Sequence, residues 1–315
     1  MKNISNVCIG VDISKNNLDA YIHPIGRFFK IANSAVEIEK FVRELAVYDV
    51  AQIACEATGG YEKLLAQLLK KNSYNLWIVD PRRIKGFIVA CGCKSKSDKI
   101  DAQKIAEFAS KNSPDYIAVS RDANLDQLRA FVSRKNDLTK FLAMEKTRLK
   151  HPSHALCLAS IKKLIKTLKL AIKAIDIEIG ALIQKDENLN TKSKYLESIP
   201  GIGKASATVL LSFVPELGEL SNKKIAALVG LCPYAYESGS FIGKRFIRGG
   251  RIVPRNALYM CALTTIKHHL PLKKFYDRLI ANKKPFKIAI VAIMHKLIVI
   301  ANSLLKKREV CITYC

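Results

Sequence analysis

The 315-residue sequence predicts an α/β domain followed by a mainly helical half. In the first third, short apolar runs alternate with segments of helical periodicity, whereas from about Asn124 to Lys185 no strand signal is present. Hydrophobic residues make up 49% of the chain and charged residues 25%. This is the composition of a globular protein, and the length is enough for two domains that each bury a core.

The strands expected in the first third are short and mostly apolar. Val7–Ile13 is almost wholly apolar, which is typical of a buried central strand. Leu18–His23 and Arg27–Ala32 are separated by the turn signal Pro24-Ile25-Gly26, so the three strands are expected to form a meander. The other expected strands are Ala51–Glu56, Leu76–Asp80 and Tyr116–Val119.

Helices are expected between and after these strands. They are a segment capped by Ser34 that runs through Leu45, then Tyr61–Lys71, Pro81–Ala90 and Ser97–Lys111. A meander followed by alternating helices and strands is the order of a ribonuclease H-like (RuvC-like) α/β domain, which we expect over residues 1–121.

Residues 122–190 are expected to form an antiparallel, coiled-coil-like helical arm. Apolar residues recur there at helical spacing, and His151-Pro152-Ser153 should end or kink the first helix. Packing within the arm is the favoured interpretation of its apolar stripe, and an oligomer seam is the alternative. The polar stretch Asp186–Ser193 is expected to be a loop at a domain boundary.

Residues 191–315 are expected to form a mainly α C-terminal domain with a glycine-rich stretch at 230–250. Its later helices are expected at Pro254–His268 and Pro285–Lys307. The segment from Leu196 to Ala207 resembles a helix-hairpin-helix turn, in which Gly201 and Gly203 would let backbone N–H groups approach a phosphate. An ordinary interhelical turn is the alternative.

The charge of the chain indicates a polyanionic partner. Lys and Arg number 52 against 27 Asp and Glu, which leaves +25, and the excess is concentrated in residues 138–175 and 241–256. A uniformly lysine-rich proteome is the alternative explanation. The basic side chains expected to contact nucleic acid are Arg82, Arg83, Lys94, Lys96, Lys99, Lys204, Lys244, Arg245, Arg248 and Arg251.

The cysteines and apolar runs indicate a cytoplasmic protein. Nine scattered cysteines, with Cys91-Gly-Cys93 as the only close pair, favour neither a zinc site nor a disulfide framework. The N-terminus lacks a signal-peptide pattern, and the longest apolar run, near Ile288–Ile300, is broken by His295 and Lys296. No membrane partner is therefore expected.

Four acids are candidates for a metal site. Asp12 and Glu56 end predicted strands, and Asp98 and Asp101 are three residues apart on a predicted helix, which places them on one face. Like charges so placed repel unless a cation lies between them, and carboxylate oxygens suit one or two Mg²⁺ ions. Singly, each acid is explained by a strand end, a turn or a helix N-terminus. Together, in this strand order, they favour metal binding.

Ser238 is a candidate nucleophile in the glycine-rich stretch. It precedes Gly239 in a basic setting where cations could offset the charge of a phosphodiester transition state. The surrounding sequence alone favours a loop serine, because no nearby histidine could activate it. A tyrosine nucleophile, Tyr234 or Tyr236, is a weaker alternative because the usual Arg-His-Arg surroundings are missing.

The chain resembles the DEDD transposases of bacterial insertion sequences, the group named after insertion sequence one-ten. The resemblance covers nearly the whole chain and lies in an ordered set of motifs: Gly-Val-Asp-Ile-Ser-Lys at 10–15, Cys-Glu-Ala-Thr-Gly-Gly-Tyr at 55–61, Val-Asp-Pro at 79–81 and Lys-Ser-Asp-Lys-Ile-Asp-Ala at 96–102.

The resemblance implies that Asp12, Glu56, Asp98 and Asp101 form the Mg²⁺-binding tetrad and that Ser238 is the nucleophile, with Ser240 the weaker choice. It also implies action as a dimer or tetramer on DNA, at the element ends and the target, directed by a structured guide RNA near the bacterial nucleoid. The alternatives are a metal-dependent Holliday-junction-type nuclease without serine catalysis and a non-catalytic nucleic-acid-binding protein.

Overall fold

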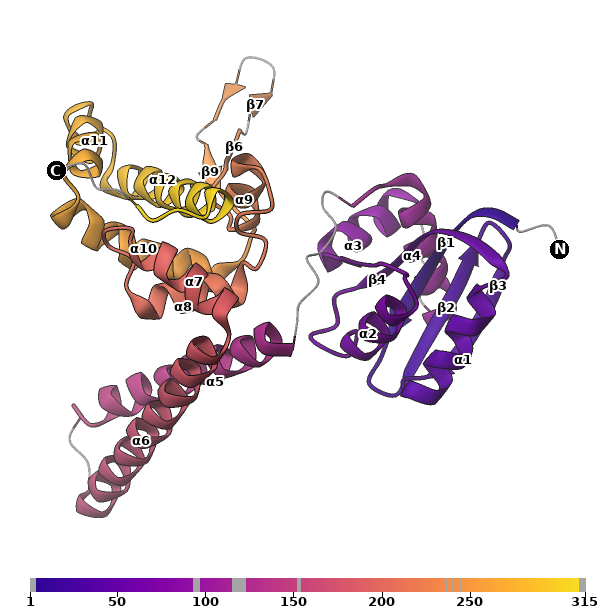
Figure 1. Ribbon diagram of the computed structural model, residues 1–315, viewed down its shortest axis with the longest axis horizontal. Helices are drawn as coiled ribbons and strands as arrows, with labels where there is room; N and C mark the ends of the chain where they lie inside the picture. The colour runs from indigo at the N-terminus through magenta and orange to yellow at the C-terminus, as the bar shows by residue number, and fades with distance from the viewer. Residues whose placement is uncertain are drawn as a thin grey trace. The chain divides into compact units, whose positions relative to one another are not determined.

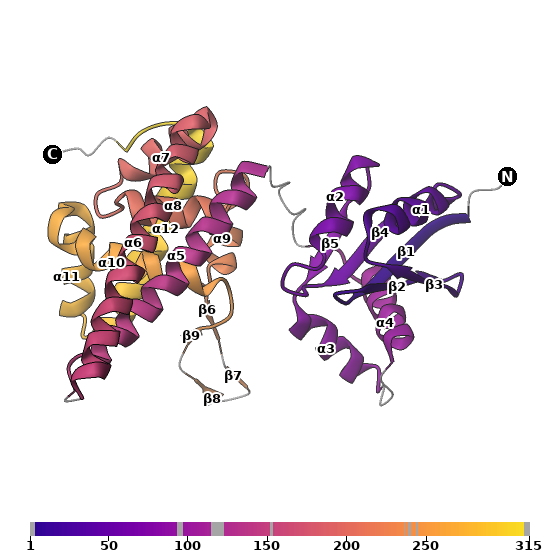
Figure 2. The same ribbon diagram turned by 90° about the horizontal axis from the view of Figure 1, so that it is seen from below.

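The computed structural model divides the chain into two compact units, Met1–Ala118 and Val119–Cys315 (Figures 1 and 2). The structure describes residues 4–92, 97–114, 123–151, 154–235, 237–238, 241–243 and 245–311. The strand predicted at Tyr116–Val119 lies outside these residues.

The N-terminal unit is built on a five-stranded mixed sheet with the order β3-β2-β1-β4-β5. The strands are β1 (Ile4–Ile13), β2 (Asn17–His23), β3 (Arg27–Ala32), β4 (Tyr48–Glu56) and β5 (Leu76–Val79). β1, β2 and β3 form the predicted antiparallel meander, and β4 and β5 continue the sheet in parallel with β1. β1 is therefore the central strand, as its apolar run predicted.

Helices cover both faces of this sheet (Figure 2). Val7, Ile9 and Val11 of β1 join the core under α1 (Ala35–Leu45) and α2 (Lys63–Lys71). The alternate residues point the other way, because side chains alternate along a strand. On that face Cys8 joins the core formed with α3 (Pro81–Ala90) and α4 (Asp98–Lys111).

Gly10 sets how closely α4 approaches the sheet. A Cβ atom at this position would overlap backbone atoms of Ala102 and Ala106, one turn apart on α4. The helix therefore lies directly on the central strand, and only glycine fits beneath it.

The second unit is helical around one large core. Its helices are α5 (Ala123–Arg148), α6 (Ala155–Lys185), α7 (Glu187–Glu197), α8 (Lys204–Phe213), α9 (Asn222–Leu228), α10 (Ile252–His268), α11 (Leu270–Ala281) and α12 (Phe286–Lys307). Leu128 and Val132 of α5, with Ile179 and Ile183 of α6, belong to the same buried cluster as the helices that follow. The base of the α5–α6 pair thus packs into the C-terminal core.

The loop predicted at Asp186–Ser193 is wrong. This stretch begins α7, where the Asp186 side chain accepts a hydrogen bond from the Leu189 backbone at 3.0 Å and so caps the helix. Leu189, Ser193 and Leu196 form its buried face. The polar composition concealed an amphipathic helix whose remaining faces are exposed. α11, which begins beside His269, was also not predicted.

α12 is long and apolar enough to cross a membrane by length and composition alone. Half of its most apolar window is buried inside its own unit, where Ile290, Ile293 and Leu297 are completely covered. Its apolar character is explained by its place in the core.

We predict that Gly10→Ala lowers the free energy of unfolding by at least about 2 kcal/mol, because the added methyl group must push α4 off the central strand. Urea unfolding of the full chain measures this change. Gly86→Ala in α3 is the matched control, since a Cβ atom there meets nothing within 4 Å. The control should leave stability equal or slightly raised. Equal effects of the two substitutions would refute the close-packing explanation.

Candidate active site

Asp12 and Glu56 lie side by side at one edge of the sheet. The strands β1, β3, β4 and β5 all run in the same direction and end at this edge. Val11 of β1 pairs with Cys55 of β4, so the next residue on each strand is a candidate acid. Both side chains are partly buried. We call this edge, with the first turn of α4, the acidic edge.

The first turn of α4 brings the other two acids to the same face. Ser97 caps the helix, accepting a hydrogen bond from the Ile100 backbone at 3.3 Å, and Asp98 and Asp101 follow in the first turn. Ala102, one turn after Asp98, lies over Gly10, and Gly10 and Asp12 point to the same face of the sheet because they are two residues apart. The close approach of α4 therefore carries its N-terminus toward Asp12.

The acids affect one another electrostatically. Burial, and after it the charges of Asp101 and Asp98, together raise the pKa of Asp12 to about 6. Sequence reasoning missed a fifth acid, Asp19, which pairs with Asp12 across β1 and β2 and is only 5% exposed. Burial raises the pKa of Asp19, and the negative charge of Asp98 also raises it. Its place opposite Asp12 depends on the strand register, which the sequence did not supply.

The acidic edge fits a divalent cation by its chemistry. All four predicted ligands are carboxylates, the donors that Mg²⁺ takes in proteins, and a cation among them would offset the repulsion recorded at Asp12. As placed in the described part of the chain, no three His, Cys, Asp or Glu side chains are close enough together to hold a metal ion.

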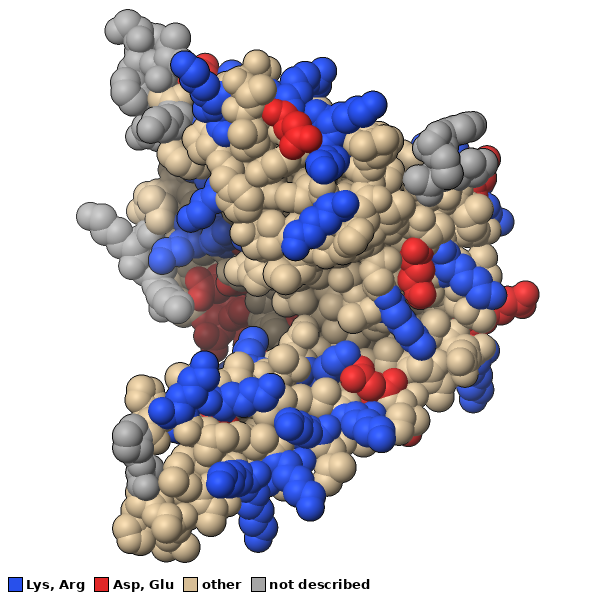
Figure 3. Space-filling view, turned by 90° about the vertical axis from the view of Figure 1, so that its left-hand side faces the viewer, with Lys and Arg blue, Asp and Glu red and all other residues tan. Residues whose placement is uncertain are grey.

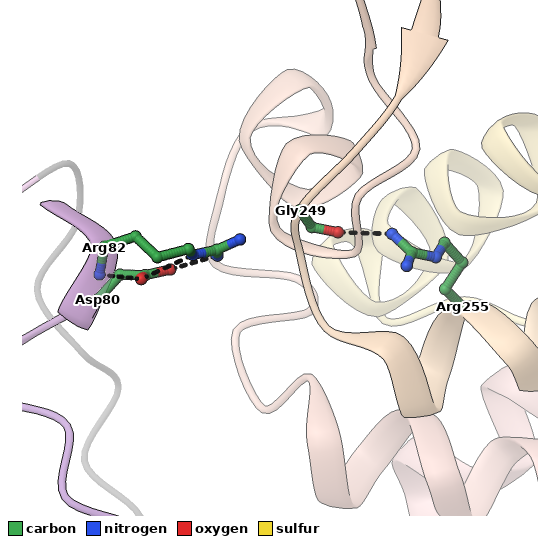
Figure 4. Close-up of polar contacts among 4 residues, drawn as sticks. All are labelled: Asp80, Arg82, Gly249 and Arg255. Atoms are coloured by element: carbon green, nitrogen blue, oxygen red, sulfur yellow. Dashed lines mark hydrogen bonds and ion pairs between the residues drawn. The ribbon is translucent and has the colours of Figure 1, made fainter. Parts of the chain in front are cut away.

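Three of the basic side chains predicted to contact nucleic acid from the N-terminal unit have local partners. Arg82 forms a two-bond ion pair with Asp80, at 2.5 and 3.0 Å, beside the acidic edge (Figure 4). This side-chain bond to Arg82 lowers the pKa of Asp80. Arg83 lies 5.5 Å from the ring centres of Trp77 and Phe108. Lys99 lies 5.7 Å from the ring centre of Phe28, and Lys94 and Lys96 fall outside the described residues.

Ser238 is exposed on a narrow β-hairpin of the C-terminal unit. β7 (Glu237–Ser238) pairs with β8 (Phe241–Ile242), with Ser238 opposite Phe241. A second short ladder, β6 (Pro233–Tyr234) with β9 (Phe246–Ile247), forms the base of the hairpin. Figure 1 shows this hairpin extending away from the helices of its own unit. Ser240, Tyr236 and Lys244 fall outside the described residues.

Two arginines of this stretch are exposed along the hairpin. Arg245 forms an ion pair with Glu237 at 3.3 Å, and Arg248 lies 5.4 Å from the ring centre of Tyr234. Because both guanidinium groups remain at the surface, they are available to an anionic ligand that competes for them.

Arg251 is held inside the fold. Its guanidinium donates to both carboxylate oxygens of Glu216, at 2.6 and 2.7 Å, and to the carbonyl of Phe213 at 2.8 Å. The Glu216 side chain is only 3% exposed. These contacts give Arg251 a structural role within the C-terminal unit. Arg255, nearby in sequence, similarly donates to the carbonyl of Gly249 at 2.5 Å (Figure 4).

The predicted helix-hairpin-helix turn joins α7 to α8. Gly201 has a φ of +97°, and a Cβ atom there would overlap the hydroxyl of Thr265 on α10. That hydroxyl donates to the Pro200 carbonyl at 2.9 Å, so Gly201 serves internal packing. Gly203 differs, because it caps α8 and its Cβ position faces open space. Lys204 begins α8 and is exposed.

Space beside this turn is open to a ligand. A shallow cavity of about 490 Å³ is bordered by the turn residues Ile199–Gly203, by Ser206 and by α10 at Met260. Lys and Arg predominate over acids on the face of the C-terminal unit seen in Figure 3. Nine Lys and Arg against one acid in residues 138–175 contribute to this basic surface.

Comparison with known proteins assigns the chain to a family. The family model for DEDD transposases of IS110, described as "Transposase", matches residues 9–156. A second, described as "Transposase IS116/IS110/IS902 family", matches residues 193–277. The chain is 28% identical over 320 residues to the pilin gene-inverting protein of Moraxella lacunata, and 27% identical over 319 residues to that of Moraxella bovis. Each alignment covers 97% of this chain and 98% of the relative.

An α/β unit with acids at one edge of its sheet, joined to a basic helical unit, defines together with these matches a DNA transposase or recombinase. The chain belongs to the IS110 family of transposases.

We predict that Asp12→Asn stabilises the metal-free chain by about 1 to 2 kcal/mol at pH 8, after allowing for solvent screening. The pKa of Asp12 is about 6 in the folded chain and 3.8 without the fold, so the ionised carboxylate opposes folding above pH 6. The advantage of the variant should shrink as the pH falls from 6 and vanish below 3.8. Urea unfolding across this pH range in chelator measures it. Asp49→Asn, at the exposed opposite end of β4, should change nothing, and an equal gain in both variants would contradict the prediction.

We predict that Arg251→Met lowers the free energy of unfolding by about 3 kcal/mol, because it leaves the buried Glu216 carboxylate without its partner. Arg245→Met, which breaks only an exposed ion pair, should leave stability unchanged. Denaturant titration of both variants makes the comparison. A wild-type midpoint for Arg251→Met would show that its ion pair does not support the fold.

Proposed function

We propose that the chain cleaves and exchanges DNA strands with a composite site formed by the acidic edge and Ser238. The observation that carries this proposal is the electrostatic coupling of Asp12 with Asp98 and Asp101, which come from segments more than 80 residues apart in a family of transposases. Glu56 joins them through the register of β1 and β4. Such a concentration of carboxylates in a DNA-handling enzyme supports a Mg²⁺ site.

We propose that the N-terminal unit is ribonuclease H-like. The strand order β3-β2-β1-β4-β5, with an antiparallel meander and two parallel strands, supports this assignment. Asp12 and Glu56 at the ends of adjacent parallel strands support it as well. One or two bound Mg²⁺ ions would polarise the phosphodiester and offset charge on the leaving oxygen. The four carboxylates would hold and orient the bound Mg²⁺ ions.

The exposed hydroxyl of Ser238 is proposed to attack the phosphorus. A bond from Ser238 Oγ to phosphorus forms, the bond from phosphorus to the leaving sugar oxygen breaks, and one DNA end becomes linked to the chain. The serine proton passes to a carboxylate of the acidic edge, and the leaving sugar oxygen takes up a proton. Attack by the hydroxyl of another strand then releases the serine and joins the new ends.

The partners follow from the family and the charge. The names of the two relatives describe inversion of a pilin gene, so we propose that this chain likewise moves or inverts a DNA segment. We further propose a dimer or tetramer whose basic surface also holds a structured guide RNA. Gly203, Lys204, Arg245 and Arg248 are the proposed backbone contacts. The site of action would be the bacterial cytoplasm, where the chromosome lies.

Ser238→Ala is predicted to reduce the covalent protein–DNA adduct at least about a hundredfold, because the variant has no attacking oxygen. The assay uses the full chain with the DNA that flanks its reading frame and RNA transcribed from that DNA, and it resolves adducts on a denaturing gel. Asp98→Asn should abolish the adduct as well.

Ser34→Ala is the matched control, because Ser34 is an exposed serine whose side chain makes no capping bond to α1. An adduct retained by Ser238→Ala but lost in Ser240→Ala would move the nucleophile to Ser240. Cleavage that needs Asp98 and neither serine would favour the nuclease without serine catalysis. Background product in every sample, including wild type, would favour the non-catalytic binding protein.

A further inference from the structure

Asn33 stands at the carboxyl edge of the sheet, directly after β3. β3 ends at the same edge as β1 and β4, but the sheet order places β3 two strands from β1 and three from β4. A side chain at this position that bonds to the segments following β1 and β4 therefore links two segments that leave the acidic edge.

The side chain makes that connection. Asn33 Nδ2 donates to the carbonyl of Ser14 at 3.1 Å and to the carbonyl of Tyr61 at 3.3 Å. Ser14 is two residues after Asp12, and Tyr61 is five residues after Glu56. Both acceptors are carbonyl oxygens, so the amide must present its NH₂ group to them, and its orientation is fixed by the contacts.

The two segments that Asn33 joins are each braced internally. Ser14 exchanges hydrogen bonds with Asn17, its Oγ donating to the Asn17 carbonyl at 2.9 Å. In the other segment the Glu62 carboxylate accepts from the Thr58 hydroxyl at 2.7 Å and from the Gly60 backbone at 2.8 Å. A bond to a braced segment limits the movement of the strand end before it, because the internal hydrogen bonds oppose deformation of the segment.

The oxygen of the Asn33 amide lowers the stability of the fold. Asn33 Oδ1 is buried and has no hydrogen-bond partner among the described residues. An unsatisfied buried oxygen opposes folding, so stability alone does not account for an amide at this position. The two N–H bonds across the acidic edge do account for it.

We propose that Asn33 is a positioning residue that fixes the separation of Asp12 and Glu56. Its donor bonds hold the ends of β1 and β4 at one spacing, which sets how well the two carboxylates accept the same cation. This inference rests on the proposed metal-dependent function. It adds a residue that contacts neither metal nor DNA.

The test compares Asn33→Leu, which fills the space without a donor, and Asn33→Ala with the wild-type chain. The Mg²⁺ concentration that gives half-maximal adduct formation should rise at least about tenfold in both variants, as for residues that orient metal ligands. The thermal transition should stay within a few degrees of wild type. Asn72→Leu is the matched control, because Asn72 makes one side-chain bond, to the Leu68 carbonyl at the end of α2 in the same unit. Its Mg²⁺ dependence should not change.

Three outcomes separate the possibilities. Adduct formation that survives Asp12→Asn would overturn the proposed function itself. Loss of the adduct in Asp12→Asn, together with wild-type Mg²⁺ dependence in Asn33→Leu, would overturn only the positioning role. Loss of the folded state in both Asn33 variants would also overturn it, because Asn33 would then hold the fold and not the acidic edge.

Discussion

The contact between α4 and Gly10 is the constraint on which the candidate site depends. A helix packed on a sheet usually stands off by the length of its side chains, but here the helix backbone lies directly on the central strand. That approach converts two acids in a helix N-terminus into neighbours of an acid at a strand end. Without it the motifs would remain separate local features, each explained by capping or by a turn.

The acidic edge gathers like charges at a cost in stability. Burial raises the pKa of Asp12 and of Asp19, and the charge of Asp98 acts in the same direction on both. A fold selected only for stability would disperse these carboxylates or pair them with cations. The nearby Arg82 instead pairs with Asp80, which lies outside the proposed tetrad. A divalent cation resolves such an arrangement, which is why the metal hypothesis is stronger for the group than for any one acid.

The C-terminal unit separates residues that support the fold from residues that face solvent. Gly201 and Arg251 look alike in sequence to Gly203 and Arg245, yet the first two are committed to internal contacts with Thr265 and Glu216. The second two remain at the surface. A glycine-rich, basic stretch can thus both support a core and present an exposed hairpin. Whether a residue supports the fold or faces solvent depends on whether its side chain finds a buried partner.

The sequence by itself determined the order of strands and helices in the N-terminal unit, because alternation, helical periodicity, turns and caps are local signals. It also determined the charge and the candidate acids. It misjudged Asp186–Ser193, since a polar stretch hides a helix whose buried face is narrow. Only the tertiary structure decided which residues meet. Strand register placed Asp19 beside Asp12, packing paired Arg251 with Glu216, and Asn33 bonds to the segments that follow β1 and β4. Such contacts join residues distant in sequence, and no local pattern records them.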